Sequence, residues 1–228
     1  MHINDSGWLT LEDSEPKTIG TSSHIVQSLV IGRSPNCSPG LVPANMKFIV
    51  AHWTGGSSAS SAQSWLSNPQ AKASAHFILD RNGQVIQLVP TDKVAWHVGP
   101  SEWKTATGNY TQLNRYSIGI EYVNLGGLKK TEGGVFISTT GRTVAPEDVV
   151  SHVENGKTTY YHAFPHDQIM AGLSLMSAIK TKFPTVEDIV GHMDIATPAG
   201  RKADPGPEFP MAWYKSKLLG RSDDETVV

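Results

Sequence analysis

The segment Lys47-Phe48-Ile49-Val50-Ala51-His52 is a short, almost continuous apolar run that ends in a histidine. Such a run is typical of a strand that is buried on both faces of a sheet. The loop Thr54-Gly55-Gly56-Ser57 follows it, and a helix is predicted over about 60–67, where Pro69 ends it. The core of the protein is therefore predicted to form around this strand.

Further strands and helices alternate along the rest of the chain. Asn82-Gly83 separates two apolar runs, which is a strong signal for a β-hairpin. The predicted strands cover about 24–31, 75–79, 84–89, 117–123 and 189–192, and the later helices cover 166–182 and 210–219. This order predicts an α/β protein: a single domain with a mixed central β-sheet that is flanked by helices.

The segments outside these elements are polar and rich in turn residues. Residues 1–32 are predicted to form an N-terminal arm packed on the domain, which covers 33–220, and residues 221–228 to form a flexible tail. Residues 124–160 are rich in glycine, threonine and lysine and are predicted to form a long excursion with at most a small hairpin.

Composition excludes several classes of function. The chain has 228 residues and a formal net charge of −2, so no basic surface for nucleic acid or for an anionic membrane is expected. No apolar stretch approaches the roughly 20 residues of a membrane span, and the first residues lack the features of a signal peptide. The single cysteine, Cys37, cannot form an internal disulfide. We expect a monomer without membrane insertion, which is cytoplasmic or leaves the cell without a signal peptide.

Three residues form a candidate metal site: His52, His192 and Asp204. Two imidazoles and one carboxylate are a ligand set for a catalytic zinc ion with one open coordination position. Zinc lowers the pKa of bound water from about 15.7 to near 7, which yields a nucleophile at neutral pH. Each residue alone has an ordinary explanation, because strand-end histidines are often structural and Asp204 lies in a turn-like segment. Together the three residues indicate a hydrolase with one Zn²⁺.

Two charged residues are candidates for catalysis. Glu121 lies on the face of the strand 117–123 opposite Ile118 and Ile120, so it is either a solvated carboxylate or the general base beside the metal. Lys202 precedes Asp204 by two residues, so an extended segment places both on the same side. It is either a surface lysine or the cation that stabilises an oxyanion, a role typically worth about 10²–10³ in rate.

Three more residues are candidates for contact with the substrate: His76, Trp96 and His97. Contact with the substrate or the site is the favoured interpretation for His97, whereas His76 could equally support the site from behind or serve the fold. The other histidines have no supporting context and are predicted to lie on the surface: His2, His24, His152, His162 and His166.

Taken in order, five segments resemble the zinc-dependent N-acetylmuramoyl-L-alanine amidases of the peptidoglycan-recognition-protein superfamily. The matching segments are 48–54, 74–83, 95–99, 117–121 and 191–206. Five ordered segments with compatible spacing, spread over about 33–215, are much more specific than any one of them. The resemblance implies the α/β fold of that superfamily, with residues 33–220 as the catalytic domain.

The resemblance also implies a reaction. His52, His192 and Asp204 would bind the zinc ion, Glu121 would position or deprotonate the water, and Lys202 would stabilise the transition state. The substrate would be peptidoglycan or a muropeptide, cleaved between the lactyl group of N-acetylmuramic acid and L-alanine. The excursion over 124–160 is longer than in compact members of the superfamily, and we expect it to form a lid or a wall of the substrate groove.

Two other classes of protein share parts of this pattern. A module that binds muropeptides without cutting them would be expected to lack a zinc ligand or the glutamate, and neither is missing. A zinc peptidase would be favoured by an HExxH helix, which the sequence does not contain. The single cysteine excludes the disulfides that are usual in animal members, so the resemblance favours a bacterial or phage source. Recycling of anhydro-muropeptides in the cytoplasm, phage lysis and delivery of a toxin to the cell wall are all compatible with the chain.

Overall fold

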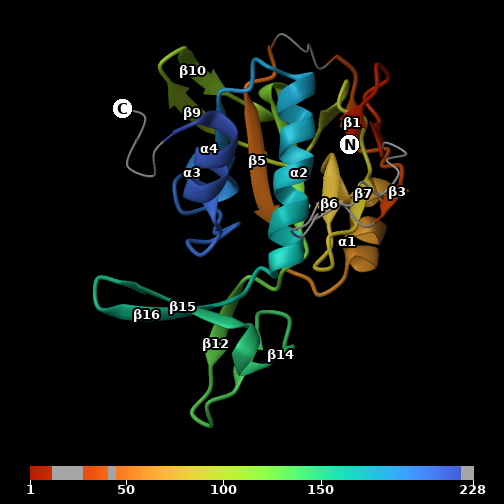
Figure 1. Ribbon diagram of the computed structural model, residues 1–228. Helices are drawn as coiled ribbons and strands as arrows, with labels where there is room; N and C mark the ends of the chain where they lie inside the picture. The colour runs from red at the N-terminus through yellow and green to blue at the C-terminus, as the bar shows by residue number, and fades with distance from the viewer. Residues whose placement is uncertain (12–27, 41–44, 222–228) are drawn as a thin grey trace, which may run out of the picture.

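A six-stranded mixed sheet forms the centre of the computed structural model, which describes residues 1–11, 28–40 and 45–221 (Figure 1). In spatial order its strands are β17 (Asp188–Gly191), β5 (Phe48–Trp53), β11 (Ser117–Tyr122), β6 (Phe77–Leu79), β7 (Val85–Gln87) and β3 (Leu29–Ile31). The first four strands are parallel, β6 and β7 form the predicted antiparallel hairpin, and β3 runs parallel to β7. The predicted mixed central sheet is confirmed.

The position of β5 explains its apolar sequence. It lies between β17 and β11, and all its residues from Phe48 to His52 are buried. Glu121 of β11 is paired directly with His52 of β5. Because parallel strands end at the same edge of a sheet, the carboxyl ends of β5, β11 and β17 bring their polar residues to one place.

Helices cover both faces of this sheet. The helix α2 (His166–Lys182) and the shorter α4 (Met211–Leu219) pack on one face, where Leu175, Ile179 and Tyr214 are fully buried. Figure 1 shows α2 crossing in front of the sheet. The helix α1 (Ala59–Leu66) packs on the other face, over Ile78 of β6. The predicted bounds of all three helices agree with the structure to within one residue.

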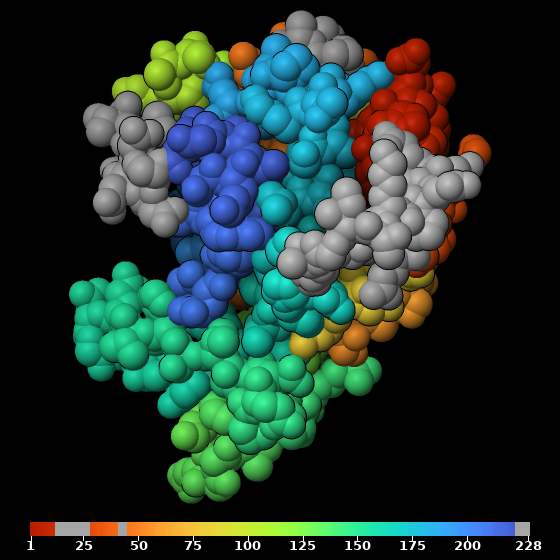
Figure 2. All heavy atoms as spheres, viewed as in Figure 1, coloured from red at the N-terminus to blue at the C-terminus, as the bar shows by residue number. Residues whose placement is uncertain are grey.

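Residues 124–160 differ from the prediction of a long loop. They contain most of a second, antiparallel sheet of five strands, which Figure 2 shows as a lobe projecting from the body of the molecule. In spatial order its strands are β14 (Thr143–Val144), β13 (Phe136–Ser138), β12 (Gly127–Lys130), β16 (Lys157–His162) and β15 (Val149–Glu154). Asn155-Gly156 joins β15 to β16 with positive φ at both residues, as a two-residue hairpin turn requires. This Asn-Gly pair was the signal in the sequence that would have revealed the ribbon.

The second sheet, which we call the lobe, has a small core of its own. Leu125, Phe136 and Val144 are buried in it, and Leu128, Val149 and Tyr160 pack around them. The short 3₁₀ helix η4 (Pro146–Asp148) leads into β15. Since three strands and an apolar cluster suffice to hold a sheet, a turn-rich sequence could form an ordered element here.

Smaller elements complete the molecule. They are the strand pairs β1 (His2–Ile3) with β2 (Leu9–Thr10), β4 (Cys37–Ser38) with β8 (Val94–Ala95) and β9 (Glu102–Thr105) with β10 (Gly108–Thr111), and the 3₁₀ helices η2 (Pro69–Ala71) and η3 (Leu113–Tyr116). The predicted arm over 1–32 therefore contributes an edge strand, β3, to the central sheet. Residues 24–27 of the strand predicted there, and 222–228 of the predicted tail, lie outside the described residues. Among the helices described, none has the length and apolar character needed to cross a membrane.

Candidate metal centre and catalytic pocket

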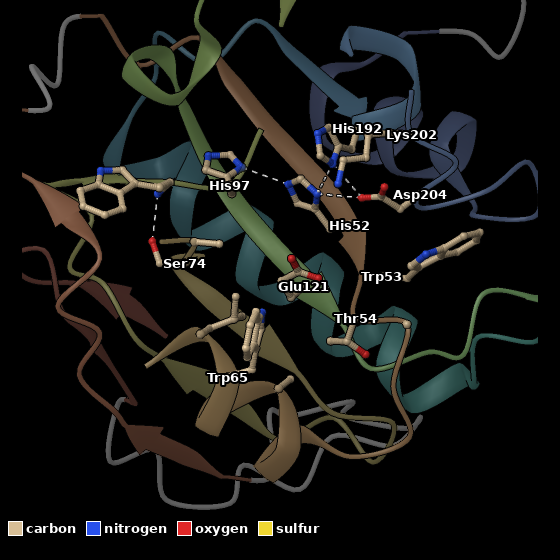
Figure 3. Close-up of a pocket in the computed structure, with 15 residues that line it drawn as sticks. His52, Trp53, Thr54, Trp65, Ser74, His97, Glu121, His192, Lys202 and Asp204 are labelled. Carbon is tan, nitrogen blue, oxygen red and sulfur yellow. Dashed lines mark hydrogen bonds and ion pairs between the residues drawn. The ribbon is translucent and has the colours of Figure 1, made fainter. Parts of the chain in front are cut away.

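Three acceptor atoms from distant parts of the sequence meet at the carboxyl edge of the central sheet (Figure 3). His52 Nδ1 lies 3.0 Å from His192 Nδ1 and 2.9 Å from Asp204 Oδ2, and His192 Nδ1 lies 3.0 Å from the same oxygen. All three residues are buried. The structure thus brings together the three residues that the sequence predicts as metal ligands.

Local backbone structure sets each of these positions. His52 is at the end of β5, and His192 opens the single-turn helix α3 (His192–Ile195) directly after β17. The amide of Gly191 donates to Asp194 Oδ2 at 2.8 Å, which fixes this turn. A Cβ on Gly191 would lie 2.7 Å from Pro205, so only glycine allows the segment around Asp204 to approach so closely. The amide of Met193 then donates to the Asp204 carbonyl at 2.7 Å and completes the arrangement.

Hydrogen bonds on the far side of each imidazole assign its tautomer. His192 Nε2 lies 3.0 Å from the Val98 carbonyl, which can only accept, so Nε2 carries the hydrogen. The Ser117 hydroxyl donates to the Leu113 carbonyl and so accepts from His97 Nε2 at 3.2 Å. His97 Nδ1 is then an acceptor for His52 Nε2 at 3.0 Å.

In the neutral form of each ring, this network leaves Nδ1 with a lone pair that faces the Asp204 carboxylate. Burial lowers the pKa of His52, more than Asp204 raises it, so the neutral imidazole is favoured. Burial alone would raise the pKa of Asp204, but a proton on the Nδ1 atom of His192 or His52 would stabilise the carboxylate, and this effect holds its pKa below the usual range. A single proton cannot satisfy three acceptors about 3 Å apart, whereas a divalent cation can. The donor set therefore fits a metal ion.

Glu121 reaches the same pocket from β11. Its Oε2 atom is buried, and among the described residues it has no hydrogen-bond partner. Burial, with a smaller contribution from the Asp204 carboxylate, raises the pKa of Glu121 to about 8, and Lys202 opposes this shift. A bound dication would lower that pKa again, because it stabilises the carboxylate. Glu121 is thus held near the protonation equilibrium that a general acid and base requires.

Lys202 is exposed and stands at the mouth of the site, next to His192 and Asp204 in Figure 3. Together with the three candidate ligands and Glu121, it lines one cavity of about 320 Å³. The cavity thus combines a candidate metal position, a carboxyl group and an ammonium group, which is what hydrolysis of an amide needs.

The residues predicted to contact substrate have different positions. His97 and Trp96 line the pocket. His76 does not belong to its lining, because its ring is fully buried between the Gly119 amide, which donates to Nδ1 at 3.1 Å, and the Lys93 carbonyl, 3.0 Å from Nε2. Both ring nitrogens of His76 therefore serve the fold, in place of the predicted contact with the substrate.

One of the histidines predicted to lie on the surface is buried instead. His162 is only 7% exposed and accepts a hydrogen bond from the Leu125 amide at 3.1 Å. His2 and His166 are exposed as predicted, and His152 is half-buried beside Glu208. His24 lies outside the described residues.

Two aromatic residues of the pocket wall are not among the site residues predicted from the sequence. Trp53 follows His52 directly, and its ring lies against Gly126 and Gly206, where a Cβ would come within 2.7 and 2.6 Å of it. Trp65 projects from α1 with 59% of its surface exposed. A tryptophan directly after a candidate ligand, and another on a short polar helix, were the signals available for them.

Comparison with known proteins shows the family of the chain. The family model described as N-acetylmuramoyl-L-alanine amidase matches residues 43–207. The Escherichia coli amidase AmiD is 33% identical over 187 residues, which cover 78% of this chain and 55% of AmiD. The Citrobacter freundii 1,6-anhydro-N-acetylmuramyl-L-alanine amidase AmpD is 28% identical over 155 residues, or 68% of this chain and 62% of AmpD. The chain thus spans less than two thirds of the length of these relatives.

Solved structures give the same result for the fold. The E. coli AmiD complex with the substrate anhydro-N-acetylmuramic acid-L-Ala-D-γ-Glu-L-Lys has a TM-score of 0.56 at 30% identity, over 78% of this chain and 58% of that one. A crystal structure of AmpD has a TM-score of 0.58 at 22% identity, over 88% of this chain and 99% of that one. The family match covers most of the chain, and we conclude that the protein belongs to the N-acetylmuramoyl-L-alanine amidase family.

Proposed function

We propose that the protein is a zinc-dependent N-acetylmuramoyl-L-alanine amidase. It would hydrolyse the amide between the lactyl group of N-acetylmuramic acid and the L-alanine of peptidoglycan or of a muropeptide. The observation that carries the proposal is the meeting of three possible metal-ligand atoms, His52 Nδ1, His192 Nδ1 and Asp204 Oδ2, beside Glu121 and Lys202 in one pocket. The relatives AmiD and AmpD, which are named for this activity, support it.

His52, His192 and Asp204 would hold the zinc ion. When bound, zinc lowers the pKa of a water molecule and polarises the carbonyl of the scissile amide. Glu121 would take a proton from the attacking water and pass it to the departing alanine nitrogen, which its buried position and raised pKa favour. The ammonium group of Lys202, at the mouth of the pocket, would stabilise the negative charge that develops on the carbonyl oxygen.

A module that only recognises muropeptides is the second candidate. The complete set of His52, His192, Asp204, Glu121 and Lys202 in one pocket argues against it, because binding alone does not require an unpaired buried carboxyl group. The domain division into 1–32, 33–220 and 221–228 and the monomeric state remain predictions, as does action in the cytoplasm or at the cell wall.

The test combines metal analysis with mass spectrometry of digested muropeptides. We expect about one zinc ion per chain, products with a free L-alanine amino group, and loss of activity on chelation that zinc restores. Glu121→Ala should keep the metal, and its turnover rate should fall by a factor of about 10²–10⁴, because general acid–base catalysis is removed.

Glu147→Ala is the matched control, because Glu147 is an exposed carboxylate in η4. Its turnover should equal that of the wild type. Cleavage between peptide residues only, or full activity of Glu121→Ala, would contradict the proposed reaction.

A further inference from the structure

A second hollow lies on the lobe. Its volume is about 570 Å³, and we call it the lobe groove; Gly127, Lys129, Thr131, Ile137, Thr159 and Tyr161 are among its lining residues. Gly127 is paired with Tyr161, and Lys129 with Ile137. Directly paired residues of antiparallel strands point to the same side, so these side chains share one face of the sheet. The opposite face carries Leu128 and Tyr160, which pack around the core of the lobe.

The lobe groove adjoins the catalytic pocket. Tyr161 lines the groove, and its ring packs against that of Trp53, with centroids 6.3 Å apart. Trp53 in turn lines the catalytic pocket, next to His52. A Cβ on Gly206 would lie within 3.5 Å of both rings, so the segment after Asp204 closes over the same aromatic pair. One pair of aromatic rings therefore separates the two hollows.

Contacts at the base of the lobe hold the groove in this position. His152 Nδ1 lies 2.8 Å from Glu208 Oε1, which joins β15 to the segment after Asp204. Asn124 donates to the His162 carbonyl at 2.9 Å and joins the end of β11 to the end of β16. A molecule bound at the metal position and long enough to pass Trp53 would reach this groove.

The side chains that line the groove suit an uncharged ligand rich in hydroxyl groups. Of the seven lining residues on this face of the sheet, four carry a hydroxyl group, namely Thr131, Thr139, Thr159 and Tyr161. Lys129 is the single charged residue among those that line the groove. Threonine and tyrosine hydroxyls both donate and accept, while the rings and Ile137 offer apolar area. A sugar presents apolar C–H faces and an edge of hydroxyls, so it matches both features. A stem peptide carries several carboxylates, and the groove has only one lysine to balance their negative charge.

We propose that the lobe groove binds the glycan strand of a polymeric substrate while the muramoyl–alanine bond lies in the catalytic pocket. This inference rests on the proposed function, and it assigns the lobe a role in choosing the polymer over small soluble fragments. Occupancy of the groove adds contact area only for a substrate that extends beyond the cleaved unit. The groove should therefore affect hydrolysis of intact sacculi and leave a soluble disaccharide–peptide unaffected.

Ile137→Asp, on the floor of the groove, and Thr139→Trp, which fills it from an exposed position, test this proposal. We expect each variant to hydrolyse sacculi about tenfold more slowly or worse, the size typical of a lost apolar contact. Their rates on a soluble disaccharide–peptide should remain those of the wild type. Val153→Asp is the matched control, because Val153 is 66% exposed on β15. His152 is paired with Thr159 and so lies on the groove face, and the next residue, Val153, therefore lies on the opposite face.

Co-sedimentation with sacculi provides a readout that does not depend on turnover. In zinc-loaded protein carrying Glu121→Ala, addition of Ile137→Asp should reduce the bound fraction, and addition of Val153→Asp should not. If the wild type cleaved neither substrate, the proposed function would fail, and co-sedimentation would still decide the role of the groove.

Three results would overturn the inference. The first is that Ile137→Asp lowers the rate of hydrolysis equally on sacculi and on the soluble substrate. The second is that Val153→Asp and Ile137→Asp lower the rate on sacculi equally. The third is that light scattering shows a dimer of the wild type and a monomer of Ile137→Asp. The last result would make the groove an interface between two copies of the chain.

Discussion

The ring of His97 decides which nitrogen of His52 faces the metal position. Its Nδ1 accepts from His52 Nε2, and its other nitrogen is committed to Ser117. Gly119 leaves the space for this ring, since a Cβ there would lie 2.5 Å from His97 Nδ1. The outer hydrogen bond of a metal-ligating histidine fixes its tautomer and orientation, so His97 acts through His52 as a positioning residue.

His97→Ala should weaken zinc binding about 10- to 100-fold, the usual cost of losing such a partner. Competition with a chromophoric chelator measures the affinity, and ¹⁵N NMR of the His52 ring reports its tautomer. Gly119→Ala should produce the same change by displacing His97, although it removes no polar group. Wild-type affinity in both variants would show that His52 needs no support from His97.

Lys202 and Asp204 are two residues apart, yet we expect their substitution to have different consequences. Asp204→Ala removes one of the three acceptors, so the protein should lose its zinc in metal analysis. Lys202→Ala leaves the ligand set complete and should keep the zinc while turnover falls by about 10²–10³. Lys217→Ala, an exposed lysine on α4, is the control. A metal-free Lys202→Ala protein would refute this division of roles.

At the scale of elements, the junction of the lobe with the main body depends on a neutral histidine. His162 at the end of β16 accepts from the Leu125 amide through Nδ1. Burial lowers the pKa of His162 to about 4, with a further contribution from Arg81 that Asp148 opposes. The Asn124 amide also donates to the His162 carbonyl. Protonation of this ring would place a cation beside Arg81 and remove an acceptor from the junction.

The lobe should therefore loosen in acid. Since the folded pKa lies below the unfolded value near 6.5, His162 stabilises the fold fully above pH 6.5, and this contribution decreases as the pH falls toward 4. With solvent screening, we expect a loss of about 2 kcal/mol. Hydrogen exchange at pH 7 and pH 4.5, with each rate divided by the intrinsic rate at that pH, would detect it as reduced protection of β15 and β16. His162→Gln should exchange fast at both pH values; equal acid sensitivity of the two proteins would contradict the assignment.

At the scale of the whole molecule, Asp188 joins parts that are far apart in the sequence. The carboxylate is 1% exposed and accepts from Lys215 at 3.1 Å, Arg221 at 3.0 Å and the Trp103 indole at 3.2 Å. It thereby ties β17 to α4, to the end of the described chain and to the β9–β10 ribbon. Since β17 leads directly to His192, the same contacts support the site.

Asp188→Ala should lower the free energy of unfolding by about 3 kcal/mol, because it breaks a buried ion pair and leaves its partners unsatisfied. Chemical denaturation measures the change. Asp5→Ala is the matched control, since the Asp5–Lys182 pair is exposed, and it should cost less than about 1 kcal/mol. Equal losses in the two variants would show that burial of Asp188 does not matter.

Local patterns were sufficient to predict the central sheet and its helices. The apolar run 48–52, the turn Asn82-Gly83 and the helical spacing over 166–182 each point to a single structure. The lobe was missed because three of its strands have only two to four residues and the other two lack a regular alternation of apolar and polar residues. His162 was misjudged for a different reason, since its burial depends on contacts with residues about 40 and 80 positions away.

The sequence by itself determined the residue types of the site and the segments that carry them. The tertiary structure places β17, β5 and β11 side by side and parallel, so His52, Glu121 and His192 meet at one edge of the sheet. Only the tertiary structure decided which nitrogens face the metal position, that His76 is structural, and that the lobe groove adjoins the pocket across Trp53 and Tyr161. These features depend on hydrogen bonds and ring contacts between segments distant in sequence, which no local pattern encodes.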